Sequence, residues 1–193
     1  IRRFSPIPRA ELERRLRFDL GRAFALATFH PDSLGGGQGA RHIDALLDAL
    51  HRGKVRAVIT YANADAGGRE INRKLEAFAK RHAPAFRVVP TLGQEGYLSL
   101  MRLARVVIGN SSSGIIEAPS LKVPTVNIGD RQRGRLRSPS IIDCDPSSPA
   151  ILRALRRALS ADFRRRCTGK NVYGKGDSSG RMLRVLKTVR LGE

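Results

Sequence analysis

The order of apolar and amphipathic segments is the feature that most restricts the fold of this chain. Six short runs of apolar, often β-branched residues alternate with longer stretches in which apolar side chains recur at helical spacing. The predicted strands are residues 24–29, 55–60, 87–90, 106–108, 125–128 and 141–144. Strands that alternate with helices are joined in βα units, which favour a parallel sheet with helices on both faces. The sequence therefore predicts an α/β protein with a Rossmann-like, doubly wound parallel sheet.

The segments between these strands predict helices, and together they indicate a single domain. The predicted helices are residues 9–20, 38–51, 69–81, 96–103, 148–158 and 178–189, and the glycines at 35–37 predict a flexible loop. With 193 residues, 41% of them hydrophobic, the chain can bury a substantial core. We expect one domain over residues 1–193, made of a lead-in helix or linker (1–22), a Rossmann-like core (23–170) and a C-terminal helix (171–193).

The net charge of +19 raises the question of nucleic-acid binding. The basic residues are spread along the whole chain, and aromatic residues, which stack on bases, make up only 5%. An arginine-rich solvated surface is the simpler interpretation, and a nucleic-acid-binding domain is kept as a rival. No apolar run is long enough to span a membrane, and the first residues do not resemble a signal peptide.

Two cysteines and the first residue of the chain lead to further expectations. Cys144 and Cys167 lack metal-ligand spacing, so we expect no metal site and two reduced thiols in a cytoplasmic protein. The chain begins at Ile1 and not at a methionine, so we expect a fragment or an excised domain.

Polar side chains follow four of the predicted strands at the point where each strand ends. His30 follows the first strand, Asn63 the second, Ser111 the fourth and Arg131 the fifth. Each has an ordinary explanation on its own, as a loop histidine, a turn asparagine, a helix cap or one of many surface arginines. In open parallel sheets, however, ligands bind at the carboxyl ends of the strands, so the convergence of all four indicates a binding site.

The segment after the fourth predicted strand indicates which ligand the site binds. A strand ends at a glycine, and three serines open a short helix ahead of Gly114. Backbone N–H groups and hydroxyls at a helix start favour an anion, and three serines exceed what capping needs. Glu117, about one turn further on, would repel phosphate, but it can accept paired hydrogen bonds from a ribose diol. The combination predicts a nucleotide, most simply a nucleotide-sugar, bound by Ser111, Ser112, Ser113, Gly114 and Glu117.

Serine nucleophilic catalysis is a competing interpretation of the same turn. A nucleophilic Ser111 would need a sharp Gly-x-Ser-x-Gly elbow and an adjacent base. The sequence has no such elbow and assigns no base to Ser111. We therefore expect these serines to bind a ligand and not to form a covalent intermediate.

Several motifs, taken together, resemble the C-terminal half of the UDP-N-acetylglucosamine 2-epimerase family. The matching segments cover most of residues 24–190 in the same order: 28–31 (Thr-Phe-His-Pro), 60–68, 109–119, 126–135 and 171–176 (Asn-Val-Tyr-Gly-Lys-Gly, where Asn-Pro-Tyr-Gly is more usual). The non-hydrolysing branch typically has an arginine and a Glu-Asn pair after the histidine. Here Pro31, Asp32 and Ser33 follow it, which favours the hydrolysing branch.

The resemblance implies a fold, a reaction and a role for each site residue. The implied architecture is GT-B, with UDP bound between two Rossmann-like halves. UDP is eliminated from UDP-N-acetylglucosamine or a related UDP-sugar, and the glycal is hydrated to give N-acetylmannosamine, without a cofactor or metal. His30 and Arg131 match positions near the diphosphate, Ser111 and Ser112 the diphosphate-binding turn, Glu117 the ribose carboxylate and Asn63 a nucleotide-sugar contact.

The resemblance also implies how the reaction is divided between the two halves. The family's acid–base carboxylates lie largely in the N-terminal half, so His30 is the one catalytic candidate here, and the fragment alone should be nearly inactive. The implied partners are an N-terminal Rossmann-like domain and a second copy in a homodimer. A donor-binding domain of a UDP-sugar glycosyltransferase is the alternative, because fold and donor site do not determine the chemistry.

Overall fold

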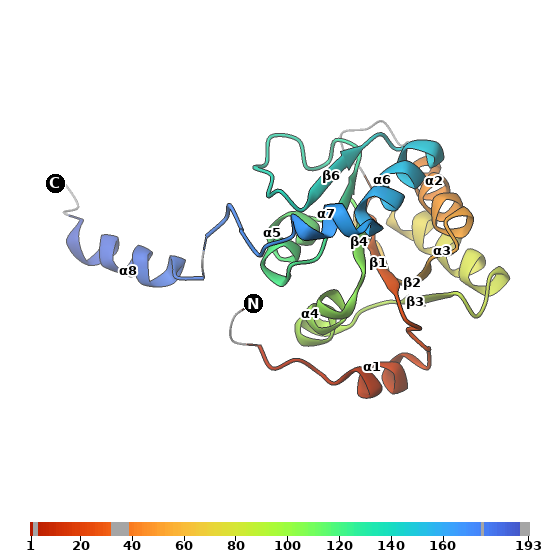
Figure 1. Cartoon of the computed structure of the whole chain (residues 1–193), viewed down its shortest axis with the longest axis horizontal. Helices are drawn as coiled ribbons and strands as arrows, with labels where there is room; N and C mark the ends of the chain where they lie inside the picture. Colours follow the sequence, from red (N-terminus) through yellow and green to blue (C-terminus); the bar gives the residue numbers. More distant parts are fainter. Residues whose placement is uncertain (2–3, 32–38, 175, 190–193) are drawn as a thin grey trace.

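A six-stranded parallel sheet forms the centre of the computed structural model, which describes residues 1, 4–31, 39–174 and 176–189 (Figure 1). The strand order is β3-β2-β1-β4-β5-β6. The strands are β1 (Phe24–Thr28), β2 (Arg56–Thr60), β3 (Phe86–Val89), β4 (Val106–Gly109), β5 (Thr125–Ile128) and β6 (Ile141–Cys144). All neighbouring strands pair in parallel, which confirms the predicted Rossmann-like sheet.

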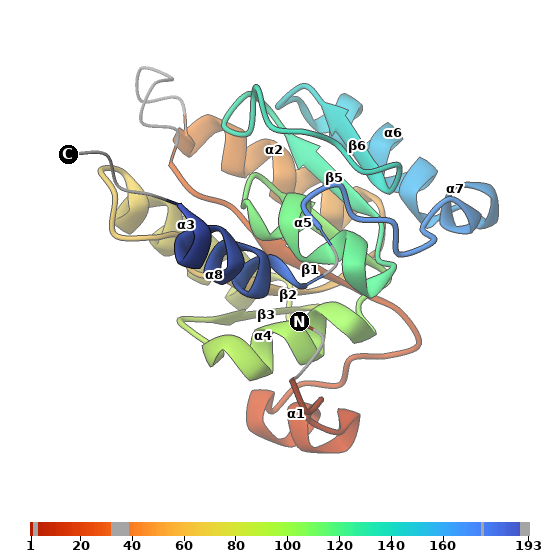
Figure 2. The same cartoon turned by 90° about the vertical axis from the view of Figure 1, so that its left-hand side faces the viewer.

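Helices cover both faces of the sheet and bury two apolar clusters against it (Figure 2). The larger cluster lies under α2 (Gly39–Arg52), α3 (Gly68–Arg81), α6 (Ser148–Leu159) and α7 (Ala161–Arg165). The smaller cluster lies under α1 (Arg9–Leu16), α4 (Gly93–Leu103) and the 3₁₀ helix η1 (Ala118–Leu121). Alternate residues of β1 supply the two clusters, Ala25 and Ala27 on one face, Phe24 and Leu26 on the other. The core is therefore built from both faces of β1, β2 and β4, while β5 supplies Val126 and Ile128 to the larger cluster.

The lead-in helix is shorter than predicted, because the chain turns at Arg17. Arg17 adopts a left-handed conformation (φ 48°), which ends α1 at Leu16 and lets Phe18 and Leu20 enter the smaller cluster as extended chain. The predicted helix at 96–103 begins earlier, at Gly93, whose backbone is left-handed (φ 62°). The predicted loop at 35–37, the start of the helix at 38, and Asp32 and Ser33 lie outside the described residues.

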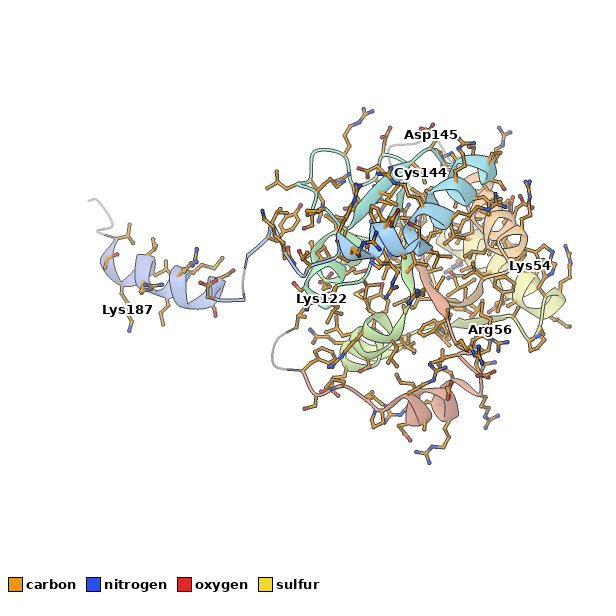
Figure 3. All side chains as sticks on the ribbon, in the orientation of Figure 1. Lys54, Arg56, Lys122, Cys144, Asp145 and Lys187 are labelled. Carbon is orange, nitrogen blue, oxygen red and sulfur yellow. The ribbon has the colours of Figure 1, made fainter. Side chains whose placement is uncertain are left out.

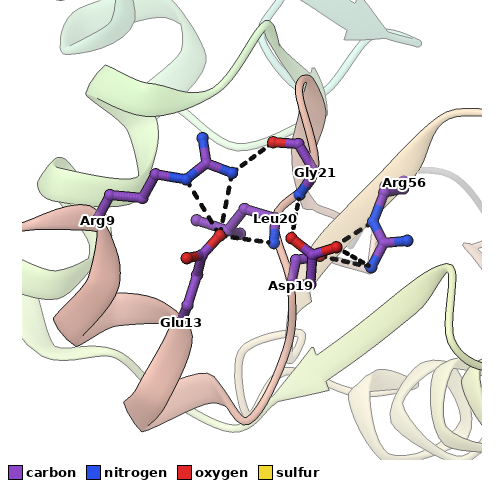
Figure 4. A network of polar contacts seen from close by, with 6 residues as sticks. All are labelled: Arg9, Glu13, Asp19, Leu20, Gly21 and Arg56. Carbon is purple, nitrogen blue, oxygen red and sulfur yellow. Dashed lines mark hydrogen bonds and ion pairs between the residues drawn. The ribbon is translucent and has the colours of Figure 1, made fainter.

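A polar network connects α1 and the segment after it to the amino end of β2 (Figure 4). Its members are Arg9, Glu13, Asp19, Leu20, Gly21 and Arg56. The Glu13 carboxylate accepts a hydrogen bond from the Leu20 N–H at 3.0 Å. Arg56, at the start of β2, donates from Nε to the Asp19 carbonyl at 3.0 Å and stacks over the Phe18 ring at 4.9 Å. Residues 9–21 therefore pack as part of the domain.

The C-terminal helix α8 (Ser178–Thr188) differs from all the others, because it stands clear of the domain (Figure 1). None of its residues is buried, and its apolar side chains Met182, Leu183, Val185 and Leu186 are 53–70% exposed. Lys187 on this helix also projects far from the sheet (Figure 3). Among the described residues, no helix combines the length and apolar character needed to cross a membrane.

Candidate functional site

The carboxyl ends of β1, β2 and β4 lie level at one edge of the sheet. Thr28 of β1 pairs with Thr60 of β2 and with Gly109 of β4. The connections leaving β1 and β4 diverge to opposite faces, which creates the crevice in which such sheets bind ligands. Gly109 has φ 135°, and a Cβ there would lie 1.9 Å from the Thr28 carbonyl oxygen, so only glycine fits. This close approach brings the residue after Gly109 beside the residues after β1.

Asn110 is that residue, and its buried amide clasps the backbone of His30. Its Oδ1 accepts a hydrogen bond from the His30 N–H at 2.7 Å, and its Nδ2 donates to the His30 carbonyl at 2.9 Å. The Asn110 carbonyl in turn accepts hydrogen bonds from Gln132 at 2.8 Å and Arg131 at 3.4 Å. Asn110, only 2% exposed, therefore joins the ends of β1, β4 and β5. The sequence analysis assigned no role to Asn110, although an amide side chain directly after the end of a buried strand could have indicated one.

The His30 imidazole is neutral and has a defined tautomer. Its Nδ1 accepts a hydrogen bond from the Asn63 N–H at 3.1 Å, so the ring proton lies on Nε2. Burial, and secondly the positive charge of Arg131, lower the pKa of His30 to about 4. At neutral pH this side chain is therefore a hydrogen-bond donor through Nε2–H and not a cation.

Two of the predicted site residues carry buried oxygen atoms that lack a partner within the described part of the chain. They are Oδ1 of Asn63 and Oε2 of Glu117. The Asn63 amide is held in place by its Nδ2, which donates to Asp65. Burial also raises the pKa of the Glu117 carboxyl. Since buried polar atoms are nearly always hydrogen-bonded, both oxygens require donors from water or from a ligand.

The serine turn is held by a tyrosine that the sequence did not single out. The hydroxyl of Tyr97, on α4, lies 2.7 Å from Oγ of Ser113, and Ser113 donates to Oγ of Ser111 at 3.1 Å. The N–H groups of Ser111 and Ser112 have no acceptor among the described residues. The helix that follows, α5 (Ser113–Ile116), has only four residues, so its dipole is small. This turn would therefore bind an anion through its free N–H groups and hydroxyls, and not through a helix dipole.

Packing accounts for the glycine in this turn. A Cβ on Gly114 would lie 2.7 Å from Cγ2 of Thr125 on β5. The Gly114 carbonyl also accepts a hydrogen bond from the Thr125 hydroxyl at 2.8 Å. Gly114 thus lets the turn lie directly on β5, while its predicted ligand contact stays a prediction.

The arginines after β5 differ in how far their charges are already paired. Arg133 forms an ion pair with Asp130 at 3.2 Å, and Arg137 one with Asp143 at 3.0 Å. Arg131 and Arg135 have no carboxylate partner among the described residues, and of these two only Arg131 borders a depression of about 660 Å³. This pairing leaves Arg131 as the member of the group best able to bind an anion.

Cys144 and Asp145 border the same depression (Figure 3). Burial, with two adjacent aspartates, raises the pKa of the Cys144 thiol to about 12. The thiol is therefore not a nucleophile at neutral pH. In the part of the chain that the structure describes, no cluster of His, Cys, Asp and Glu side chains could hold a metal ion.

The structure thus connects some of the predicted site residues directly and leaves others separate. Direct contacts link His30 with Asn63, and Asn110 links both to Arg131. The serine turn begins at the residue after Asn110. The Glu117 side chain makes no hydrogen bond to the other site residues within the described chain.

Comparison with known proteins shows the family and the fold of the chain. A family profile described as UDP-N-acetylglucosamine 2-epimerase matches residues 6–187. The GDP/UDP-N,N'-diacetylbacillosamine 2-epimerase (hydrolyzing) of Campylobacter jejuni is 40% identical over 75% of this chain and 38% of its own. The UDP-N,N'-diacetylbacillosamine 2-epimerase (hydrolyzing) of Legionella pneumophila is 30% identical over 99% of this chain and 49% of its own.

A solved structure, the S. aureus MnaA-UDP co-structure, has the same fold (TM-score 0.71, 15% identity), covering 93% of this chain and 48% of that one. The chain spans about half the length of these curated relatives. It belongs to the UDP-N-acetylglucosamine 2-epimerase family, and its two curated relatives support assignment to the hydrolysing branch.

Proposed function

We propose that this chain is the UDP-binding half of a hydrolysing UDP-N-acetylglucosamine 2-epimerase. The observation that carries the proposal is the pair of unpartnered buried oxygens, on Asn63 and Glu117, in a chain whose serine turn has free donors. A bare phosphate is mainly a hydrogen-bond acceptor and is too small to donate to both oxygens at once while it accepts from the serine turn. A nucleoside diphosphate sugar has an anionic centre for the donors and hydroxyl groups for the acceptors.

The diphosphate is proposed to lie against the serine turn and the neighbouring strand ends. The N–H groups of Ser111 and Ser112, Nε2–H of His30 and the guanidinium of Arg131 are the donors for its oxygens. In the elimination step, negative charge grows on the departing UDP as its bond to the sugar breaks. Donors already fixed in place stabilise that charge without reorganising, so these residues would lower the barrier to elimination.

The hydroxyl groups of the ligand are proposed to satisfy the two unpartnered oxygens. Glu117 would accept hydrogen bonds from the two ribose hydroxyls, which offsets the free-energy cost of burying its carboxylate. Asn63 would accept from a hydroxyl elsewhere on the nucleotide-sugar, with its amide orientation set by Asp65. Ser113 and Gly114 shape the turn between the two contacts.

The complete enzyme is proposed to contain an N-terminal Rossmann-like domain that covers this site in a GT-B arrangement. The exposed apolar side chains of α8 need a partner surface, and that domain is the proposed one. It would also supply the carboxylates that move protons at the sugar, so this chain alone should release almost no N-acetylmannosamine.

Calorimetry on this chain tests the binding proposal. UDP should bind more tightly than uridine or pyrophosphate, because only UDP engages both the donors and the acceptors. Glu117→Ala should weaken UDP about tenfold, equivalent to roughly 1.4 kcal/mol, and leave pyrophosphate unchanged. Equal losses for UDP and pyrophosphate would refute the ribose role, and no binding at millimolar UDP by the folded chain would refute the proposal.

The full-length protein tests the reaction. Incubated with UDP-N-acetylglucosamine and no acceptor, it should release UDP and free N-acetylmannosamine. A parallel incubation with a diacetamido UDP-sugar identifies which sugar is preferred. Turnover that depends strictly on an added acceptor would instead identify a glycosyltransferase.

Substitutions on α8 test the domain arrangement. Leu186→Asp should lower the thermal stability of the full-length protein and leave that of this chain unchanged, because the side chain is 70% exposed here. Lys187→Asp on the same helix is the control. A concentration-dependent dimer of this chain that Leu186→Asp abolishes would show that a second copy covers α8 instead.

A further inference from the structure

Five hydroxyl groups form an unbroken chain beneath the carboxyl edge of the sheet. Oγ1 of Thr60 lies 2.7 Å from Oγ1 of Thr28, which lies 3.1 Å from the Tyr97 hydroxyl. The Tyr97 hydroxyl lies 2.7 Å from Oγ of Ser113, and Ser113 donates to Oγ of Ser111 at 3.1 Å. The chain crosses from β2 through β1 and α4 to the start of α5, although its members are far apart in the sequence.

The direction of every hydrogen bond in this hydroxyl chain follows from its last bond, the one that Ser113 donates to Ser111. A hydroxyl has one proton to donate. Since Ser113 donates to Ser111, it must accept from Tyr97. Tyr97 must then accept from Thr28, and by the same reasoning Thr28 accepts from Thr60.

Ser111 receives two hydrogen bonds on its oxygen, one from the Ser113 hydroxyl and one from the Ser113 N–H at 3.4 Å. Both lone pairs of that oxygen are therefore occupied, so the Ser111 proton points to a further acceptor. Each hydroxyl donates to the next in the same direction, and hydrogen bonds linked in this way polarise one another. The occupied lone pairs also make Ser111 a poor nucleophile.

We propose that Tyr97 is a positioning residue that orders this hydroxyl chain, so that Ser111 presents a polarised proton donor to a diphosphate. The inference rests on the proposed function in taking UDP as the ligand, but the hydroxyl chain itself requires only an anion at Ser111. Tyr97 is suited to the role because it lies at the centre of the chain and contacts both halves of it. Burial raises the pKa of the Tyr97 phenol, so it keeps the proton that the chain needs.

Removal of single hydroxyls tests the inference by calorimetry with UDP, inorganic pyrophosphate and uridine. Tyr97→Phe should weaken both UDP and pyrophosphate about five- to tenfold and leave uridine unchanged, because only the anion meets Ser111. Thr28→Val should give a smaller loss of about twofold, since its link is more distant from Ser111. Thr28→Ser retains the hydroxyl and should match the unsubstituted chain.

Tyr173→Phe is the matched control, because its hydroxyl donates to the Leu136 carbonyl outside the chain of hydroxyls. Urea unfolding of each variant shows that the fold persists. Equal losses for uridine and pyrophosphate, or equal effects of Thr28→Val and Thr28→Ser, would show a merely structural role and overturn the inference.

The same titrations separate this inference from the proposed function. Pyrophosphate binding that Tyr97→Phe weakens, without any preference for UDP, would support the hydroxyl chain and refute the UDP site. UDP binding that Tyr97→Phe leaves unchanged would refute the hydroxyl chain alone. If the folded chain binds neither ligand, both are wrong.

Discussion

Replacement of Asn110 by alanine should be among the most damaging single changes in this domain. The substitution removes two hydrogen bonds to the His30 backbone, at 2.7 and 2.9 Å, at a side chain that is 2% exposed. Each lost bond costs about 1 kcal/mol, and leaving the His30 N–H and carbonyl without partners adds a desolvation penalty of about the same size. We therefore expect a loss of about 3 kcal/mol in the free energy of unfolding.

Urea unfolding followed by circular dichroism measures this loss as a shift in midpoint at constant slope. Asn72→Ala is the matched control, since Oδ1 of Asn72 accepts a single hydrogen bond, from the Ala62 N–H at 2.8 Å, and should cost about 1 kcal/mol. Asn110→Asp retains the acceptor but sets a second carboxylate oxygen against the His30 carbonyl at a buried position, so its cost should equal or exceed that of Asn110→Ala. If Asn110→Ala lowers the free energy of unfolding no more than Asn72→Ala does, the second hydrogen bond to His30 adds no stability and the reasoning is wrong.

Three further outcomes are expected. Gly114→Ala places a Cβ 2.7 Å from Cγ2 of Thr125 and should cost about 2 kcal/mol in urea unfolding, part of which Thr125→Ser should restore by removing that methyl group. Between pH 6.5 and 4 the unfolded chain binds a proton at His30 that the folded chain does not, so stability should fall as the pH drops, by about 2 kcal/mol after allowance for solvent screening. His30→Asn, which keeps an acceptor for the Asn63 N–H, should flatten this part of the curve, and an unchanged curve would contradict the assignment. The Cys144 thiol, with its pKa raised to about 12, should react with iodoacetamide at pH 8 only after denaturation, as mass spectrometry can show.

The central strands were predictable because they are buried on both faces and so read as nearly continuous apolar runs, whereas the edge strand β6 carries an exposed Asp143. The bounds of β5 and β6 agree with the prediction at both ends, and the other strands differ by one residue. The lead-in helix was less predictable, since its end depends on the left-handed conformation of Arg17 and on a network that reaches Arg56 on β2. Such contacts between distant parts of the chain have no periodic signature in the sequence.

The candidate site was predictable to the extent that it follows from topology. Strand ends meet at one edge, so the strand pattern alone is enough to place His30, Asn63 and the serine turn together. The supporting residues could not be placed in this way. Asn110 serves the site through the His30 backbone, and Tyr97 serves it from the middle of α4, where its spacing marks it as an ordinary core residue. Both act on their neighbours through hydrogen bonds, which only the assembled fold brings within reach.

The state of His30 bears on where proton transfer must occur. Abstraction of a proton from the sugar needs a base with a free lone pair near neutral pH. Nδ1 of His30 already accepts the Asn63 N–H, and Nε2 carries the ring proton, so neither nitrogen can receive another proton without loss of a contact. Its pKa of about 4 also makes it a weak base. These properties suit a phosphate donor better than the catalytic role for which His30 was the one candidate in this half. They favour the proposed division of labour, in which this half stabilises the leaving group and the carboxylates of the proposed N-terminal domain move the protons.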